Sequence, residues 1–443
     1  MRNLLLFSIL FIISFSVYAQ DEDENQKENE QKEVKKQERK SIIDTLTYQT
    51  ASGLPIAASK IYFSDSRFTV SGFFESNYTN YRGSKNTSSG DLELYQTNLQ
   101  RFVSYMAYKP KKWLILYGEI FLEFANDGSN EYDVEYLPEF FVDFLLDEKF
   151  NVRVGTHQPQ IGFINNNDEP VMFYSVNRPE VERLIIPSQW IDLGVMSYGN
   201  INENWKWSLS AYQGLDVNSL NGATWIRGGR EEVLRFNLSN YLINSSIKYN
   251  NNKGLEVGLN GVYTRMDLGE VDGFSNTSNT ILGSTYVRKE WDNFTLMALG
   301  SYGKMSNTEG VFAATANENG IGEVLGSDVY GYYVEAGYDI LPILGLNKTK
   351  HEKKDGVIFK SHEMKLPLFV RYERLDTHAN SNASINSFLV SQSDLEAVTV
   401  GLNFNPRRSM VLKANYQFRN NNALMPDGFR EGNRFELGLG FIF

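Results

Sequence analysis

The 443-residue sequence predicts an all-β protein, a transmembrane antiparallel β-barrel of about 16 strands whose third extracellular loop folds inward. Three observations predict this fold: the alternation of the final strand, an N-terminal export signal, and a series of alternating segments whose connections are short and long in turn. The mean hydropathy of -0.37 is compatible with it, because only every second residue of a barrel strand faces lipid. Aromatic residues make up 14% of the chain, which fits girdles at the two membrane interfaces.

Residues 434–443 read as a strand with two different faces. One parity carries Phe435, Leu437, Leu439, Phe441 and Phe443, and the other carries Arg434, Glu436, Gly438 and Gly440. Successive side chains of a strand point to opposite faces, so one face is apolar and the other polar or small. A strand of a soluble sandwich could alternate in the same way. Because the chain stops at an aromatic residue, we favour the closing strand of an outer-membrane barrel.

Residues 1–19 have the features of a cleaved signal peptide. Arg2 supplies a positive charge, residues 4–15 are apolar, and residues 17–19 end at Ala19 before the expected cleavage site. A membrane anchor is the alternative, but the apolar run is too short and lacks a stop-transfer flank. The sequence contains no cysteine, and therefore neither a lipobox nor a disulfide framework.

Residues 20–67 are expected to form a charged, largely disordered periplasmic segment. Residues 21–40 consist of Asp, Glu, Asn, Gln, Lys and Arg, with Val34 as the one apolar exception. This composition cannot bury a core, so the alternative to disorder is a solvated helix. A coiled-coil stalk would need hydrophobic heptad positions, which are missing. Residues 41–67 read as an irregular lead-in to a barrel that spans residues 68–443.

About sixteen segments from Phe68 onward read as strands, an even number, as in single-chain bacterial barrels. They lie near 68–79, 92–108, 112–125, 133–146, 149–157, 190–200, 203–213, 240–250, 255–266, 279–290, 292–303, 328–341, 363–376, 392–405, 409–420 and 432–443. Short connections, such as 405–408, alternate with long ones, such as 304–327, as periplasmic turns and extracellular loops do. The connection 342–362 breaks this rule, and it is either an insertion in a turn or an unrecognised pair of strands.

Charged residues in these segments share one parity, and we assign that parity to the lumen. An Arg or Lys at the lipid midplane would cost roughly 2–4 kcal/mol, so the charged face must be wet. The predicted lining residues are Glu119, Glu123, Glu139, Asp143, Arg153, Arg371, Glu373, Lys413, Arg419 and Arg434. This assignment excludes a lumen packed with apolar side chains. The lipid-facing and lumen-facing sides of the second strand cannot be assigned in this way, because the apolar Leu99 and Val103 share a parity with Arg101.

The lumen charges are grouped by sign along the sequence. Carboxylates come mainly from the segments 112–125 and 133–146, and basic residues come mainly from the segments between 363 and 443. Two separate arcs of opposite charge would create a transverse field that orients polar solutes. The alternative is a set of wall salt bridges that satisfy one another.

The connection 158–189 is the longest in the predicted barrel. Its charged residues are Asp168, Glu169, Arg178, Glu180, Glu182 and Arg183. A loop of this length is usually functional or disordered, and its many aliphatic and aromatic residues argue against disorder. We expect the loop to fold into the barrel and to narrow the pore with these charges. An ordered external cap is the alternative.

No pattern typical of covalent chemistry stands out. The four histidines, His157, His351, His362 and His378, show no metal-ligand spacing. The sequence contains neither a Gly-x-Ser-x-Gly elbow nor a phosphate-binding loop. We therefore expect no enzymatic activity, no cofactor and no metal site. The formal net charge of -11 argues against a general nucleic-acid binder.

Several stretches resemble the phosphate-selective porin O and P family, in the form common in Bacteroidota. They are VRVG at 152–155 with GF at 162–163, PSQWIDLGV at 187–195, FVRYERLD at 369–376 and GLNF at 401–404. The likeness covers about residues 68–443, and it implies a trimeric channel with a loop folded inside. Phosphate selectivity would require a ladder of inward basic residues. The candidates are Arg153, Arg178, Arg183, Arg371, Lys413, Arg419 and Arg434, with which the lumen carboxylates compete.

We therefore expect an outer-membrane porin of a Gram-negative bacterium, through which small hydrophilic solutes and ions diffuse passively. A phosphate- or anion-selective channel is the first alternative, and a non-conducting surface or assembly protein is the second. The expected partners are outer-membrane lipid and lipopolysaccharide, small hydrophilic or anionic solutes, and further copies of the chain in a homotrimer. The barrel-assembly machinery is expected to recognise the strand that ends in Phe443.

Overall fold

The computed structural model describes residues 45–83, 98–126, 133–136, 139–230, 239–251, 253–345, 358–389, 392–422 and 431–443. The chain divides into two units, Met1–Thr45 and Leu46–Phe443, and everything below concerns the second. The predicted signal peptide and residues 20–44 of the predicted charged segment lie outside the described residues. No helix in the described ranges is long and apolar enough to cross a membrane.

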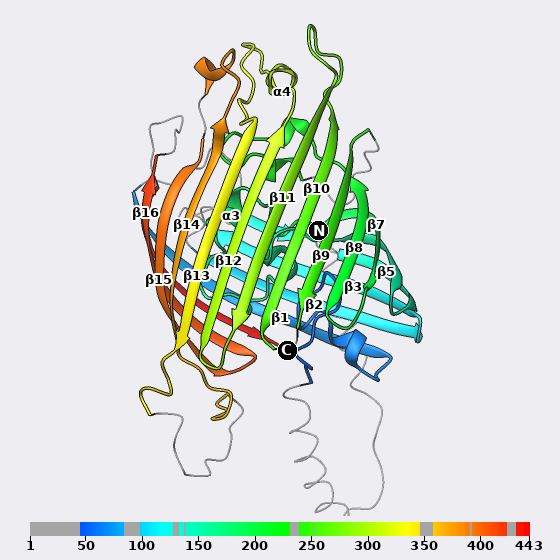
Figure 1. Cartoon of the computed structure of the whole chain (residues 1–443), viewed down its shortest axis with the longest axis vertical. Coiled ribbons are helices and arrows are strands. Elements are labelled where there is room, and N and C mark those ends of the chain that lie inside the picture. The colour runs from blue at the N-terminus through cyan, green and yellow to red at the C-terminus, as the bar shows by residue number, and fades with distance from the viewer. Residues whose placement is uncertain are drawn as a thin grey trace, which may run out of the picture. The chain divides into compact units, whose positions relative to one another are not determined.

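Antiparallel strands form one closed sheet (Figure 1). The strands are β1 (Phe68–Gly83), β2 (Asn98–Lys111), β3 (Leu114–Asn126), β4 (Asp133–Tyr136), β5 (Glu139–Asp147), β6 (Phe150–His157), β7 (Asp192–Asn200), β8 (Trp205–Gln213), β9 (Tyr241–Asn250), β10 (Leu255–Asp267), β11 (Thr277–Glu290), β12 (Phe294–Met305), β13 (Asp328–Asp339), β14 (Pro367–Asn380), β15 (Asp394–Arg407), β16 (Met410–Asn421) and β17 (Glu431–Ile442). The helices are η1 (Lys60–Phe63), η3 (Ile164–Asn166), α3 (Glu180–Leu184), η4 (Val217–Ser219), η5 (Arg227–Gly229), α4 (Thr308–Ala314) and η6 (Asn386–Phe388).

The barrel closes where the last strand meets the first. β17 pairs with β1, and Phe73 lies opposite Ile442 in their register. β4 and β5 both pair with β3, so they are two parts of one barrel strand. The barrel therefore has 16 strands, as predicted, and it closes through the pairing of β17 with β1.

The long connection 342–362 is an insertion in a turn. β13 pairs directly with β14, and Asp339 lies opposite Pro367, so the register leaves no place for another pair of strands between them. Residues 346–357 of this connection lie outside the described residues. Figure 1 shows the described parts of this connection below β13, at the end of the barrel where most other connections are tight.

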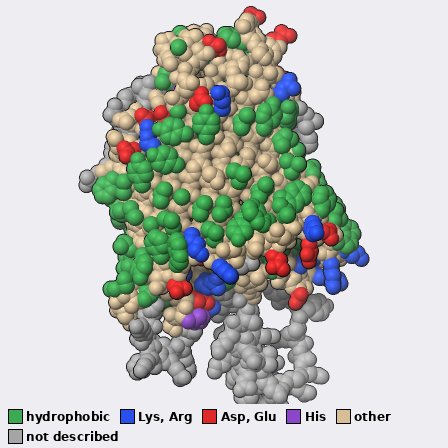
Figure 2. Space-filling model, in the orientation of Figure 1, with side chains coloured by type: hydrophobic (Ala, Val, Ile, Leu, Met, Phe, Trp, Pro, Cys, Tyr) green, Lys and Arg blue, Asp and Glu red, His purple; other side chains and the backbone are tan. Residues whose placement is uncertain are grey.

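The two faces of the wall follow the predicted parity. Outward-facing Phe140 and Leu368 are each 52% exposed, whereas inward-facing Asp143 and Glu373 are each 0% exposed. β2, whose faces could not be assigned from the sequence, also places its charged residue in the lumen, because Arg101 points inward and is buried. Figure 2 shows hydrophobic side chains spread over the outer wall, with charged side chains gathered toward its rims. This distribution is the one that a hydrocarbon layer around the barrel requires.

Part of the lumen is packed with apolar side chains, and the expectation that excluded such packing is wrong. Inward-facing Leu282 and Val329 of the wall are buried in one cluster with Ile185 and Trp190 of the long loop. Trp225, from the connection between β8 and β9, belongs to the same cluster and donates a hydrogen bond from Nε1 to the carbonyl of Gly326 (3.1 Å). The loops supply an apolar surface inside the barrel, so the wall opposite them can be apolar too.

Residues 46–63 are ordered, which differs from the largely disordered segment that the sequence predicted there. They end in η1 and bury Leu54 and Ile61 against the inward-facing Phe73 and Val103 of the wall. The compact unit therefore begins at Leu46 and not at residue 68.

Candidate functional site

The loop between β6 and β7 lies inside the barrel. The amide of Gln160 donates to Asn244 Oδ1 of β9 (2.9 Å), and the amide of Val176 donates to Asn415 Oδ1 of β16 (2.8 Å). These two strands stand well apart around the wall, so the loop crosses the lumen between them. The predicted inward fold is confirmed, and the alternative of an external cap is not what the chain adopts.

Inward-facing glycines make room for this loop. A Cβ atom at Gly440 would lie 2.3 Å from Pro170 Cβ, and one at Gly337 would lie 2.5 Å from Tyr174 Cε2. Real Cβ contacts essentially never come this close. Gly440 on the closing strand and Gly337 on β13 therefore leave the space that the side chains of Pro170 and Tyr174 occupy.

Glu180, at the start of α3, gathers three arginines. Its Oε1 accepts from Arg183 NH1 (2.9 Å), lies 3.1 Å from Arg419 NH1, and accepts a short hydrogen bond from Arg434 NH2. Its amide donates to Glu373 Oε2 (2.6 Å). The carboxylate of Glu180 therefore joins α3 to β16 and β17, and its backbone amide joins α3 to β14.

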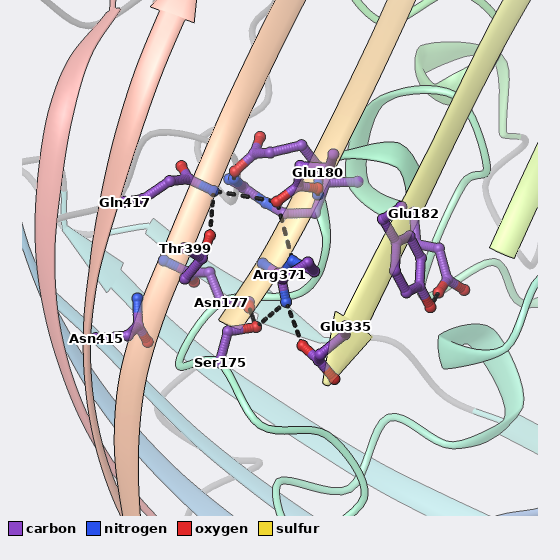
Figure 3. Close-up of polar contacts among 12 residues, drawn as sticks. Ser175, Asn177, Glu180, Glu182, Glu335, Arg371, Thr399, Asn415 and Gln417 are labelled. Carbon is purple, nitrogen blue, oxygen red and sulfur yellow. Dashed lines mark hydrogen bonds and ion pairs between the residues drawn. The ribbon is translucent and has the colours of Figure 1, made fainter. Parts of the chain in front are cut away.

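Arg371 forms the second centre of contacts on the same wall (Figure 3). Its Nε donates to Glu373 Oε1 (3.0 Å), and its NH1 donates both to Glu335 Oε2 (3.1 Å) and to Ser175 Oγ (2.5 Å). Figure 3 shows Ser175 reaching Arg371 from the loop while Glu335 approaches from the neighbouring strand. The guanidinium is 2% exposed and paired with two carboxylates, so its charge is neutralised within the wall.

A separate set of pairs lies on β1 to β6. Arg101 sits between Glu75 (3.0 Å) and Glu123 (2.5 Å), which flank it in register across the three strands. Arg153 contacts Asp143 (2.9 Å) and lies over the ring of Phe141. Both arginines are buried and both are paired with carboxylates, so neither presents an uncompensated positive charge to the lumen.

Glu119 and Glu139 lie directly opposite each other on β3 and β5. Both side chains are buried. The structure therefore brings two of the predicted lining carboxyl groups together on one side of the lumen.

Two more loop carboxylates, Glu182 and Glu169, accept hydrogen bonds from backbone N–H groups. Glu182 Oε2 accepts from the amides of Phe163 (2.7 Å) and Ile164 (2.6 Å), and Glu169 Oε1 accepts from the amide of Ala57 (2.6 Å). Burial raises the pKa of Glu182, and burial raises the pKa of Glu169 to about 8. Glu182 therefore joins two parts of the loop to each other, and Glu169 joins the loop to Ala57.

Two more of the predicted residues pair within the loop or against it. Asp168 lies 3.9 Å from Arg178, and burial raises the pKa of Asp168. Lys413 Nζ donates to the carbonyl of Ser175 (2.9 Å) and lies 3.8 Å from the centre of the Phe173 ring. The ammonium of Lys413 is therefore held by a carbonyl dipole and an aromatic face.

The wall contains ion pairs of the kind that the salt-bridge alternative describes, with Arg153 on Asp143 in the acidic arc and Arg371 on Glu373 in the basic arc. The two arcs are separated by β1 and β2, because β17 closes on β1. The transverse field itself stays a prediction. Glu75, Arg101 and Glu335 belong to this network, although no prediction placed them in the pore. Glu75 and Glu335 lie on the inward-facing parity of β1 and β13, so strand alternation alone could have identified them as lumen residues.

A cavity of about 1040 Å³ opens beside these contacts at the turn end of the barrel. Lys206, Lys248 and Arg288 face it from β8, β9 and β11, and Glu256 and Glu290 line the same wall. Phe163, Met172 and Tyr174 of the loop form another side. We call this cavity the vestibule.

Known proteins share this sequence pattern and this fold. The model of the phosphate-selective porin O and P family matches residues 115–443. An uncharacterized protein of Aquifex aeolicus is 25% identical over 393 residues, which are 85% of this chain and 81% of the relative. OprB of Pseudomonas putida has a similar fold, with a TM-score of 0.54 and 8% identity over 87% of this chain and 96% of that one.

An anion-selective porin from Comamonas acidovorans matches with a TM-score of 0.47 and 13% identity over 85% of this chain and 99% of that one. A family model that covers most of the chain, on a closed barrel with an internal loop, settles the class of protein. The chain belongs to the phosphate-selective porin O and P family, and it is an outer-membrane channel for passive diffusion.

Proposed function

We propose that this channel passes small hydrophilic solutes and ions with weak charge selectivity, in the outer membrane of a Gram-negative bacterium. The loop 158–189 and the paired charges of the wall would set what passes. One observation carries the proposal: each lumen or loop arginine that the sequence singled out lies within 4.0 Å of a carboxylate. These arginines are Arg153, Arg178, Arg183, Arg371, Arg419 and Arg434. Arg183, Arg419 and Arg434 share Glu180, and the same wall also carries Glu335, Glu373 and Glu436. Basic and acidic groups mixed in this way exert little net field on a passing ion.

The vestibule supports the same conclusion. Lys248 lies 2.8 Å from Glu256, and Arg288 contacts Glu290. Basic and acidic groups therefore alternate along the surface that a solute meets first from the turn end. A surface of this kind stays wet and attracts neither sign strongly.

The test is conductance of the purified full chain in planar bilayers, with the reversal potential measured across a potassium chloride gradient. We expect open-channel currents and a reversal potential close to zero. A reversal potential near the equilibrium value for either ion would contradict weak selectivity. Absence of any ion passage would instead favour a non-conducting surface or assembly protein.

A phosphate- or anion-selective channel is the second candidate, because the family's description names phosphate and because six arginines and Lys413 lie in the wall or the loop. In that case millimolar phosphate would reduce the chloride current in a saturable way. Arg371→Ala and Arg434→Ala would then weaken anion preference. If phosphate changes the current no more than sulfate does, phosphate selectivity is excluded, and a reversal potential that shows cation preference would exclude the anion-selective channel as well.

Homotrimer formation is a further part of the proposal. Ser76 and Gln100 face outward opposite each other on β1 and β2, where the outward-facing neighbours Phe74 and Phe102 are apolar. A groove of about 550 Å³ next to them is lined by Leu402, Leu412 and Leu437. Polar groups in a lipid-facing wall are costly unless another surface covers them, and a second copy of the chain would do so. Analytical ultracentrifugation in detergent should give a trimer mass, and Gln100→Arg should lower it.

The remaining partners follow from the closing strand. Phe443 exchanges backbone hydrogen bonds with Gly72 (2.9 Å and 3.0 Å), and its ring faces outward. We propose that the barrel-assembly machinery recognises this terminal aromatic and that the apolar wall contacts lipid and lipopolysaccharide. Deletion of Phe443 should then slow insertion in cells more than it slows folding of the purified chain in detergent.

A further inference from the structure

Residues 46–63, which we call the inner segment, fill part of the lumen at the turn end of the barrel. Leu54, Ala57 and Ile61 are 3%, 0% and 0% exposed. They pack in a cluster with wall residues of β1, β2, β3 and β5 that face the lumen, among them Phe73 and Phe141. Packing of this kind fixes a chain segment in one position, because water does not separate it from the wall.

Polar contacts tie the inner segment to the wall at two places. Tyr62 OH donates to Asp143 Oδ2 (2.5 Å), and Arg153 NH2 donates to Tyr62 OH (3.1 Å). Ser71 Oγ, on β1, donates to the carbonyl of Ala57 (2.6 Å). The segment is therefore held at its C-terminal end by β5 and β6 and near its middle by β1.

The inner segment is also joined to the loop that crosses the lumen. Glu169 Oε1 accepts from the amide of Ala57 (2.6 Å), and Gln160 Nε2 donates to Ser52 Oγ (3.2 Å). Glu169 is 0% exposed, so its carboxyl group has no access to solvent and contacts the inner segment instead. The loop and the inner segment thus meet inside the barrel as one packed layer.

The other side of the inner segment faces the open space. Tyr48, Gln49, Thr50 and Ile56 line the vestibule, and Arg408, from the turn between β15 and β16, lies 4.2 Å from the centre of the Tyr48 ring. The segment therefore runs from this turn across the lumen to β5. Any solute in the vestibule passes beside it.

We propose that the inner segment is a second, built-in constriction of the channel, which acts together with the loop and confines passage to the vestibule side of the lumen. Glu169 is its positioning residue on the loop. This proposal rests on the conducting function described above. It assigns a role in size selection to residues that precede the first strand, which the local sequence pattern marks as irregular.

The first test removes residues 46–63 from the full chain, so that residue 45 is joined to residue 64. Current through a wide aqueous pore scales with its open cross-section, so the deletion should raise single-channel conductance by at least about twofold. It should also let larger sugars enter proteoliposomes in a swelling assay. Unchanged conductance and an unchanged sugar size limit would overturn the proposal. A wild-type protein that does not conduct would instead overturn the channel function itself.

A second variant guards against a deletion that fails to fold. Ala57→Glu places a carboxylate at a buried position facing Glu169, so it should release the segment while all strands are retained. Thr47→Glu adds the same charge at an exposed position of the same segment and should change nothing. Heat-modifiable migration in gels reports whether each barrel is folded. Equal conductance of the two folded variants would refute the role of the segment.

A third measurement uses the absence of cysteine from the chain. Gln49→Cys places a thiol on the vestibule wall, and Lys112→Cys places one on the turn between β2 and β3. A bulky charged methanethiosulfonate reagent should reduce the current through the first variant by at least about twofold and leave the second unchanged. Equal responses would show that the segment does not border the conducting path.

Discussion

Replacing Glu180 by Gln should release the internal loop from the wall. Glu180 is 2% exposed and its carboxylate contacts Arg183, Arg419 and Arg434. Gln keeps the shape of the side chain but removes the charge, which leaves three buried guanidinium groups with one carboxylate fewer. Removing one member of a buried ion pair typically costs about 3–5 kcal/mol. The cost falls on the state in which the loop is docked, because undocking returns the loop arginine to water.

Hydrogen exchange measured by mass spectrometry can detect this loss. The amide of Val176 donates to Asn415 and exchanges when the loop leaves the wall. Each 1.4 kcal/mol corresponds to about a tenfold change in the opening constant, so exchange in peptides covering 172–186 should accelerate roughly a hundredfold to several thousandfold. Glu318→Gln, at an exposed position, is the matched control and should exchange like wild type.

A second consequence of Glu180→Gln concerns ions. The variant removes one negative charge beside the pore wall, so the reversal potential in a salt gradient should shift toward anion preference. The reasoning is refuted if exchange in 172–186 rises by less than about tenfold, since the ion pairs would then contribute no more than exposed ones do.

Three further changes test other contacts. Gly440→Val should destabilise the docked loop by about 1–3 kcal/mol through overpacking against Pro170, whereas Gly300→Val, with no atom within 4 Å of its added Cβ, should not; equal urea midpoints would contradict this. The docked form holds a proton on Glu169, whose pKa is about 8 against an ordinary 4.5, so docking should weaken as pH rises through this window. Glu169→Gln should abolish that slope in thermal unfolding, and a slope that persists would exclude Glu169 as its source. Lys206→Glu, in the vestibule, should shift the reversal potential toward cations, whereas Lys112→Glu should leave it unchanged, and identical values would exclude the vestibule from ion selection.

The location of each wall side chain could be predicted from the sequence. Arg434 and Glu373 face the lumen and Phe435 and Leu368 face outward because the period of a strand is two and because hydrocarbon excludes charge. Both causes act within a few residues, so no knowledge of the rest of the chain is needed. The even number of strands followed from the same alternation, even though the long insertion after Asp339 obscured one turn.

The pairing of the charges could not be predicted in this way. Arg434 finds Glu180, which is 254 residues away, because the loop crosses the lumen and presents α3 to the closing strand. Local periodicity carries no information about the path of a loop. The charge arcs were inferred from the wall alone, whereas the loop and the neighbouring strands supply many of the partners of these charges.

Burial inside the lumen was equally inaccessible from the sequence. Leu282 and Val329 face inward although they are apolar, because the loop brings Ile185 and Trp190 against them. The inner segment has no strand or helix period, and Ile61 becomes buried only where β1, β2 and β3 provide an apolar wall. The face of each strand that meets lipid can be read from the order of the residues, because it depends on neighbouring residues and the solvent. The side chains that fill the pore are known only from the folded chain, because they meet through contacts between segments far apart in the sequence.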